Sequence, residues 1–516
     1  MFATFSRMPV ILYLFVLITI LGYQPVQAKD RPAKNKSIII AGRFQTNIGD
    51  TIFLRVWENV YLNAKKGFLP HQSYSTKLRN GQFHISIQGV KDIAYVSIGR
   101  KNNESALPAD LLDMYLAEPG DSIFITEKLR PGRVIPYEWG DICEACSDFS
   151  FSGRGQEKWT CQWSLEERLR RDYDMLMAFQ QEPDSTIVGR LTQFLRQRSY
   201  MVNNRLELLK TYEHKLSTRI YQQLMIDIIA ATGQECMGFL QYHLLRLPEN
   251  TDPALLETVR RAYQLDAGLY NFNQQYFEPA LWKSAYTGLM IASKSLVEAR
   301  LTGQHPYTII KQQFSGRLRD KYLTAFLTNQ NKISNADSLM EDALLTMHTP
   351  EYQKILRQQL YQQRIGAPVY NFALKDSLGN TVQLSDFRGK YVLIDFYFVG
   401  CSGCSYYFQH KLSKAEAFFH GDSNIVFMTV SIDTNPVKWH KGLASGEYTS
   451  PMAINLNTGP EGINHPVIKQ LLIQAYPSPT LVDRQGNLLI NDTNTLLKCT
   501  AEELIRTLQH VLAKGS

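Results

Sequence analysis

Apolar and polar residues alternate with a period of two from the late thirties to about residue 126. In one run, Ile52, Leu54 and Val56 are separated by polar or exposed-type positions, and a second run repeats the pattern thirty residues later. Gly-Asp and Asn-Gly pairs, which favour tight turns, separate these runs. Short alternating strands at this spacing are typical of a small antiparallel sandwich or barrel. We therefore predict a β-sandwich-like domain over residues 29–150.

The period changes to about 3.6 in the middle of the chain. Leu165 and Leu169 begin a series of apolar residues that share one helical face. Ser164, followed three residues later by Glu167, has the spacing of a capping box and predicts a helix start there. We expect residues 151–364 to form an all-α region.

A third pattern covers the C-terminal part of the chain. An almost continuous apolar run, Tyr391–Tyr397, leads into two cysteines separated by two residues. A second buried-type strand follows, and Thr500 with Glu503 has the spacing of a capping box before a last amphipathic helix. This alternation predicts an α/β domain over residues 365–516, and hence a multidomain chain.

The N-terminus has the features of a secretory signal. Arg7 precedes an uncharged run, Val10–Gly22, and Val26 and Ala28 place small residues before a plausible cleavage point. The apolar run is shorter than the roughly 20 residues of a spanning helix. We predict a cleaved signal over residues 1–28, with an uncleaved N-terminal anchor as the alternative. The mature chain would then lie outside the cytoplasm, where disulfides persist.

Composition narrows the function classes. With 516 residues and 44% hydrophobic content, the chain can bury a substantial core, which excludes a wholly disordered protein. The net charge of +7 includes no long basic run, so nucleic-acid binding has no support. Seven cysteines are too few for a disulfide scaffold, and their spacing is the informative feature.

The two closely spaced cysteines indicate thiol-disulfide chemistry. Cys401 falls where a strand turns into a helix, where free N–H groups stabilise a thiolate, so it is the expected nucleophile. Cys404 is the expected resolving thiol. Asp395 interrupts the apolar strand, and a buried carboxylate there could take the proton of Cys404. Asp433 is a second candidate for that role, and a solvent-facing Asp395 is the alternative.

From about residue 365 to 512 the chain resembles the thioredoxin superfamily and, within it, exported TlpA/ResA-like thiol-disulfide oxidoreductases. The motifs that carry the resemblance are a GxPxxxF opening, the LSDFRGK segment, the strand that ends in CxxC, and a Pro-Thr pair before an Asp and a Gly turn. The resemblance implies that Pro479 is cis and lies against the CxxC, and that the Ser478 backbone pairs with an extended substrate strand. It also places Asp395 at the position of the buried acid of thioredoxin. The first zone resembles, more weakly, the β-rich domain that often precedes such domains.

The resemblance favours a reductase whose substrate is a disulfide-containing protein. Export predicts a location in the periplasm, and in that oxidising compartment a reductase requires a membrane thiol electron donor. We expect no cofactor and no metal. Two departures concern the redox motif. Val399 and Gly400 precede the first cysteine, where thioredoxins commonly carry tryptophan, and Ser402 and Gly403 replace the frequent proline-containing pair.

Several alternatives stay open at this point. The chain could be a cell-envelope binding protein in which the thioredoxin-like domain is a docking module. A peroxiredoxin shares the opening motif, but its threonine and proline positions are occupied here by Phe398 and Ile394. Cys143 and Cys146 form a second CxxC that could be a structural disulfide, a redox relay or, with Cys401 and Cys404, part of a zinc site.

Overall fold

The computed structural model describes most of the chain from Ser37 onwards. The described segments are residues 37–44, 51–58, 72–101, 109–130, 147–178, 187–244, 256–257, 259–261, 263, 274–329 and 336–514, apart from residues 472, 474 and 492. The predicted signal, residues 1–28, and the pair Cys143 and Cys146 lie outside them. Among the described helices, none has both the length and the apolar content needed to cross a membrane.

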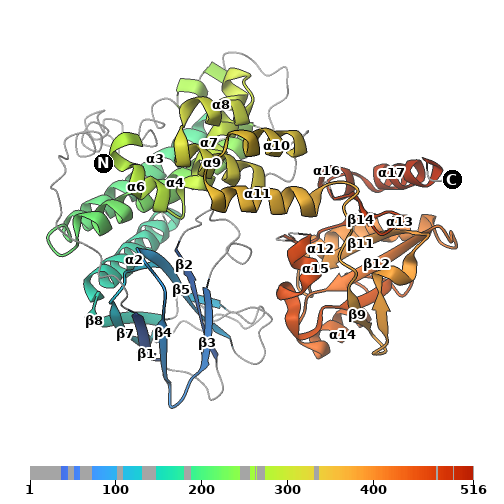
Figure 1. The fold of residues 1–516 in the computed structure, drawn as a ribbon, viewed down its shortest axis with the longest axis horizontal. Coiled ribbons are helices and arrows are strands. Elements are labelled where there is room, and N and C mark those ends of the chain that lie inside the picture. Colours follow the sequence, from blue (N-terminus) through green and yellow to red (C-terminus); the bar gives the residue numbers. More distant parts are fainter. Residues whose placement is uncertain are drawn as a thin grey trace.

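The N-terminal region consists of two four-stranded sheets (Figure 1). The sheets have the strand orders β4-β1-β7-β8 and β3-β2-β5-β6 and share one apolar core. Every pair is antiparallel except β1 with β7, which run parallel, so the expected all-antiparallel pairing is wrong at that one position. Burial alternates along β4 and β7, as the period of two predicts. The strands are β1 (Ile38–Arg43), β2 (Thr51–Trp57), β3 (Gln72–Lys77), β4 (Gln82–Ile87), β5 (Ala94–Lys101), β6 (Ala109–Ala117), β7 (Ser122–Leu129) and β8 (Ser147–Arg154).

The middle region is helical, as predicted. Its helices are α2 (Gln156–Ala178), α3 (Ile187–Lys210), α4 (Thr218–Leu244), α6 (Gln274–Lys283), α7 (Thr287–Thr302), α8 (Pro306–Gln313), α9 (Gly316–Asn329), α10 (Ala336–Thr346) and α11 (Pro350–Gln363). The helix start expected at Ser164 is wrong, because α2 begins eight residues earlier. The Ser164 hydroxyl lies inside α2 and donates to the carbonyl of Thr160, one turn back.

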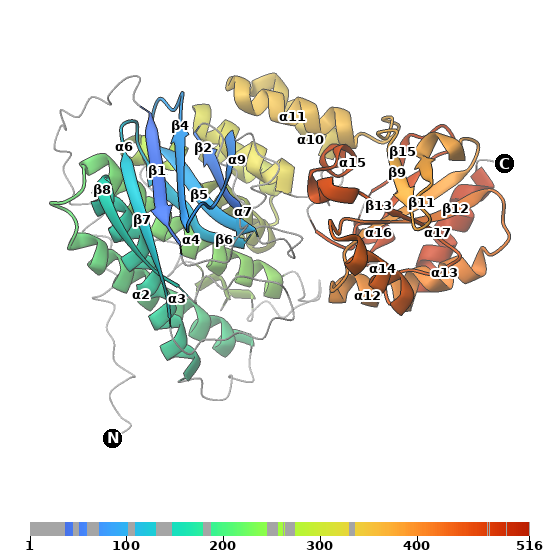
Figure 2. The same ribbon diagram turned by 90° about the horizontal axis from the view of Figure 1, so that it is seen from below.

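The helical region and the β region share a core. Trp57, Tyr95 and Leu116 of the sheets are buried in the same apolar cluster as the helices. The Tyr95 hydroxyl donates to the buried carboxylate of Asp227 on α4 at 2.6 Å. Figures 1 and 2 show the helices packed over the sheets, with the C-terminal domain beside them at the end of α11.

The C-terminal domain is built on a seven-stranded sheet of order β10-β9-β13-β12-β11-β14-β15. The strands are β9 (Ala373–Asp376), β10 (Thr381–Gln383), β11 (Tyr391–Tyr397), β12 (Ile425–Ser431), β13 (Ile454–Asn457), β14 (Thr480–Val482) and β15 (Leu488–Ile490). The α-helices are α12 (Ser402–Tyr407), α13 (Ser413–Phe418), α14 (Pro436–Ser445), α15 (Pro466–Gln470), α16 (Thr493–Leu496) and α17 (Ala501–Lys514). The 3₁₀ or π helical segments are η5 (Leu384–Phe387), η6 (Phe408–Leu412) and η7 (Gly459–Asn464).

Strand β11 lies at the centre of this domain. It is buried at every position, as expected for a strand covered on both faces. Its neighbour β12 runs parallel and β14 antiparallel. One face of the sheet packs on α15, and the other on α12, α13 and α17. The predicted multidomain layout, with β, all-α and α/β parts, is confirmed, and so is the capping box of Thr500 and Glu503.

Candidate functional site

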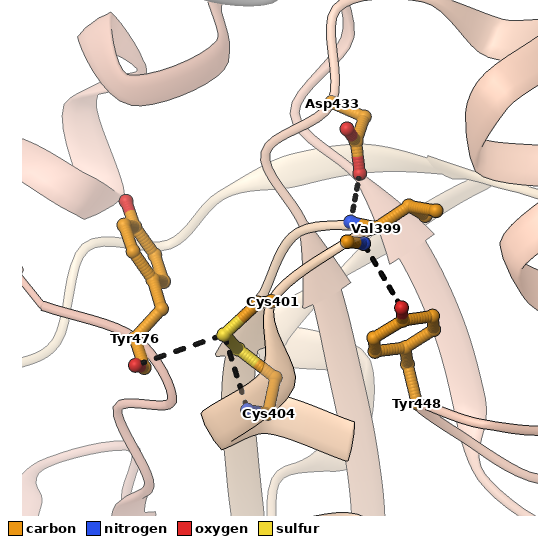
Figure 3. Close-up of a disulfide and its surroundings, with 7 residues drawn as sticks. Val399, Cys401, Cys404, Asp433, Tyr448 and Tyr476 are labelled. Atoms are coloured by element: carbon orange, nitrogen blue, oxygen red, sulfur yellow. Dashed lines mark hydrogen bonds between the residues drawn. A yellow bond between two sulfur atoms is a disulfide. The ribbon is translucent and has the colours of Figure 1, made fainter. Parts of the chain in front are cut away.

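Cys401 and Cys404 form a disulfide at the junction of β11 and α12 (Figure 3). The backbone N–H of Cys404 donates to Cys401 Sγ at 3.1 Å. Cys401 is 8% exposed and Cys404 only 1%, so the first sulfur is the more accessible one. Because a hydrogen-bond donor favours the ionised thiol, Cys401 is the better placed of the two to act as a nucleophile.

Two side chains hold the backbone that precedes Cys401. The N–H of Val399 donates to the Asp433 carboxylate at 2.8 Å, and the N–H of Gly400 donates to the Tyr448 hydroxyl at 2.9 Å (Figure 3). Asp433 also accepts from the hydroxyl of Ser431. Asp433 therefore anchors the loop at Val399, and Tyr448 holds Gly400, the residue directly before the first cysteine.

We expect the Tyr448→Phe variant to loosen this loop. The change removes the acceptor of the Gly400 N–H and keeps the ring, so the loss is one hydrogen bond of about 1 kcal/mol. Hydrogen exchange of the peptide that contains Gly400, followed by mass spectrometry, should become roughly fivefold faster. Tyr476→Phe is the matched control, because its hydroxyl makes no hydrogen bond to any described residue. Equal exchange rates in both variants would contradict this role of Tyr448.

Asp395 is buried in the middle of β11. It lies on the same face as Leu393 and Tyr397, which share cores with α12 and α13. At 1% exposure it cannot be the solvent-facing carboxylate of the alternative interpretation, which is wrong. Burial raises the pKa of Asp395 well above its ordinary value, and nearby backbone N–H groups offset only part of this effect. An acid with a raised pKa on the face covered by the CxxC helix is suited to proton transfer.

The proline beside the disulfide is not the expected one. The cis peptide bond joins Tyr476 to Pro477, whereas Pro479 was expected to be cis. The Tyr476 carbonyl oxygen lies 3.8 Å from Cys401 Sγ. A side-chain carbon at Gly403 would lie 3.5 Å from Pro477 Cδ. Pro477 and Pro479 are two residues apart in the sequence, and the prediction that Pro479 is the cis proline is wrong.

Ser478 and Pro479 directly precede β14 in the structure. The Ser478 N–H donates to the Phe396 carbonyl at 3.2 Å, so it is already bonded within the domain. Pro479 directly precedes the first residue of the strand, a position where the missing N–H of proline is tolerated. The backbone group nearest Cys401 is therefore that of Tyr476, which the motif in the sequence did not indicate.

The remaining described cysteines are buried. Cys161 lies in the core beneath the sheets, where burial raises its pKa to about 12. Cys236 is within α4 and Cys499 precedes α17. Across the described residues, no cluster of three or more His, Cys, Asp or Glu side chains could hold a metal ion.

Comparisons with known proteins concern the C-terminal domain. Residues 365–488 match the model of the AhpC/TSA family. The match includes the central strands, the CxxC and the cis proline that lies beside it. The C-terminal domain is thioredoxin-like.

Several solved structures are similar to a part of this chain. The thioredoxin domain of a thiol-disulfide oxidoreductase from Bacteroides vulgatus is 26% identical, with 28% of this chain and 96% of that chain covered and a TM-score of 0.25. A thiol:disulfide interchange protein from Bacteroides sp. is 26% identical over 29% and 90% of the chains, with a TM-score of 0.25. A thiol-disulfide oxidoreductase from Bacteroides fragilis is 18% identical over 28% and 98%, with a TM-score of 0.24. No curated protein matches the chain.

Proposed function

We propose that this protein is an exported, TlpA/ResA-like thiol-disulfide oxidoreductase that reduces disulfides of partner proteins. The observation that carries the proposal is the disulfide of Cys401 and Cys404 at the end of β11, with the first sulfur the more accessible. The match of residues 365–488 to a thioredoxin-like family model supports it.

The proposed reaction starts from the reduced dithiol. The Cys401 thiolate attacks one sulfur of the substrate disulfide, forms a mixed disulfide and releases the other substrate sulfur as a thiolate, which takes a proton from water. Cys404 then loses its proton to the carboxylate of Asp395 and attacks Cys401 Sγ. The substrate leaves with both sulfurs reduced, and the protein keeps the disulfide, having given two electrons.

The substrate would approach along the segment before the cis proline. The Tyr476 carbonyl oxygen is next to Cys401 Sγ, and an extended peptide paired with this backbone would place its disulfide within reach. This proposal moves the pairing role from Ser478 to Tyr476, because the Ser478 N–H is already bonded to Phe396.

The apolar segment near the N-terminus supports export to the periplasm. A reductase in an oxidising compartment needs a source of electrons, so we infer a membrane thiol donor that returns the Cys401–Cys404 pair to the dithiol.

The direction of electron flow is tested by the reduction potential of Cys401 and Cys404 in a variant whose other five cysteines are serine. A reductase is expected near the potential of thioredoxin, roughly −270 mV. A value near about −120 mV would instead indicate a protein that donates disulfides. The absence of a reversible two-electron couple would favour the binding-protein alternative.

The Cys401→Ser variant is expected to abolish disulfide reduction, measured with a protein disulfide as substrate and a chemical dithiol as donor. Cys161→Ser is the control, since that thiol is buried and its raised pKa keeps it protonated. Hydrogen peroxide, offered in place of the disulfide, tests the peroxidase alternative. Reduction that survives the loss of Cys401 would contradict the proposed function.

A further inference from the structure

Asp395 belongs to a row of polar residues across three neighbouring strands. In the parallel pairing of β11 with β12, Asp395 is opposite Thr429, and in that of β12 with β13, Thr429 is opposite Asn455. Residues paired in this way place their side chains on the same face of a sheet. The face is otherwise apolar where it packs on α12 and α13.

Hydrogen bonds connect this row to a second buried acid. The hydroxyls of Thr429 and Thr449 both donate to the Asn455 side-chain oxygen, at 2.8 and 2.6 Å. The Asn455 amide donates to the Ser450 carbonyl at 2.9 Å. The Ser450 hydroxyl in turn donates to Glu416 Oε2 at 2.6 Å. Glu416 lies on α13, so the polar layer runs from β11 to the helix that covers it.

Neither acid is neutralised by an ion pair with a described residue, although both are buried. Glu416 is 3% exposed and Asp395 1% exposed. Both oxygens of Asp395 and Oε1 of Glu416 have no hydrogen-bond partner among the described residues. Two negative charges held in such a layer repel each other with little solvent screening. The pair of acids is therefore far more stable with one proton bound than with both carboxyl groups ionised.

We propose that Glu416 is a positioning residue of the redox site whose charge determines how firmly Asp395 holds the proton taken from Cys404. The proposal rests on the proposed function, in which Asp395 receives that proton. While Glu416 is ionised, Asp395 holds its proton more firmly, and when Glu416 is neutral, Asp395 releases the proton more readily. Burial raises the pKa of both acids, and the charge of Glu416 raises that of Asp395 further.

Other ionisable groups face the pair. The charge of Asp395 contributes to the raised pKa of Tyr397 on β11 and of Tyr407 on α12. Cys499 also contributes to the raised pKa of Tyr407. Burial raises the pKa of Tyr397 and of Tyr407, so both phenols stay neutral near pH 7. Glu416 is the carboxylate on this face whose charge raises the pKa of Asp395.

The test is an infrared titration of the full-length oxidised protein, which needs no substrate. The carbonyl band of a protonated buried acid that disappears in Asp395→Asn belongs to Asp395. In Glu416→Gln the midpoint of this band should move to lower pH by about one unit or more, the size expected of strongly interacting sites. Because Asp395 is still protonated while Glu416 titrates, Asp395→Asn should leave the midpoint of Glu416 nearly unchanged.

Three further variants separate charge from structure. Glu416→Asp keeps the charge and should keep the Asp395 midpoint raised. Ser450→Ala removes the hydrogen bond to Glu416 without changing its charge, and it should leave the Asp395 midpoint raised as well. Glu461→Gln removes an exposed carboxylate and should have no effect. An Asp395 midpoint that is unchanged in Glu416→Gln would overturn the inference, whether or not the protein reduces disulfides.

Discussion

The Cys404→Ser variant should remain covalently joined to its partner proteins through Cys401. Without Cys404, the mixed disulfide can be resolved only by an external thiol. Intramolecular attack by a positioned group is faster by many orders of magnitude, so resolution should slow by at least about a thousandfold. Adducts should appear on non-reducing gels of protein isolated from cells, and mass spectrometry should locate the link at Cys401.

Two variants define what these adducts mean. Cys401→Ser should form none through this site, because Cys404 is the less accessible sulfur. The double variant Cys404→Ser with Cys161→Ser should trap the same partners, since Cys161 is buried in the core of the other region. A Cys404→Ser protein that is recovered from oxidising cells without adducts would argue against the two-step mechanism.

The periodicity of the sequence predicted the three parts of the fold because each period reports which face of an element is buried. Local signals were less reliable. The serine and glutamate spacing at Ser164 resembles a helix start, yet α2 continues through it because Trp159 and Leu165 pack into the cores on either side of that position. The same spacing at Thr500 and Glu503 is a true cap, as the reciprocal hydrogen bonds show.

In the candidate site, the sequence revealed the residues that lie on one continuous segment. Asp395 lies on β11, Cys401 follows it and Cys404 is in the first turn of α12, and the types of these residues alone indicate the chemistry. Tyr448 and Glu416 could not be recognised in this way, because only the folded loop after α14 and the packing of α13 bring them to the strand. The residues around a tyrosine or glutamate that is distant in sequence from the CxxC form no motif that would indicate such a role.

The Asp395→Asn variant should make the C-terminal domain more stable relative to wild type as the pH rises. An unfolded aspartate has a pKa of about 3.9, whereas burial raises the pKa of Asp395 well above that value. Above about pH 4, the folded protein holds a proton that the unfolded chain has lost, so the wild type loses up to about 1.4 kcal/mol of stability per pH unit. This loss continues until the folded-state pKa is reached, and asparagine does not titrate. Hydrogen exchange of β11 and β12 peptides measures the difference directly.

The same variant should slow the resolution of the mixed disulfide near neutral pH, because the acceptor of the Cys404 proton is gone. Asp433→Asn is the contrasting control. It weakens charge-assisted hydrogen bonds to Val399 and Ser431, worth about 1.5–3 kcal/mol each, and should destabilise the domain. A buried acid that lowers stability but speeds proton transfer is expected at a functional site. An acid retained for folding would instead raise the stability of the domain, so its replacement by asparagine would destabilise the domain. A stability difference between wild type and Asp395→Asn that does not change with pH would therefore count against a proton-transfer role for Asp395.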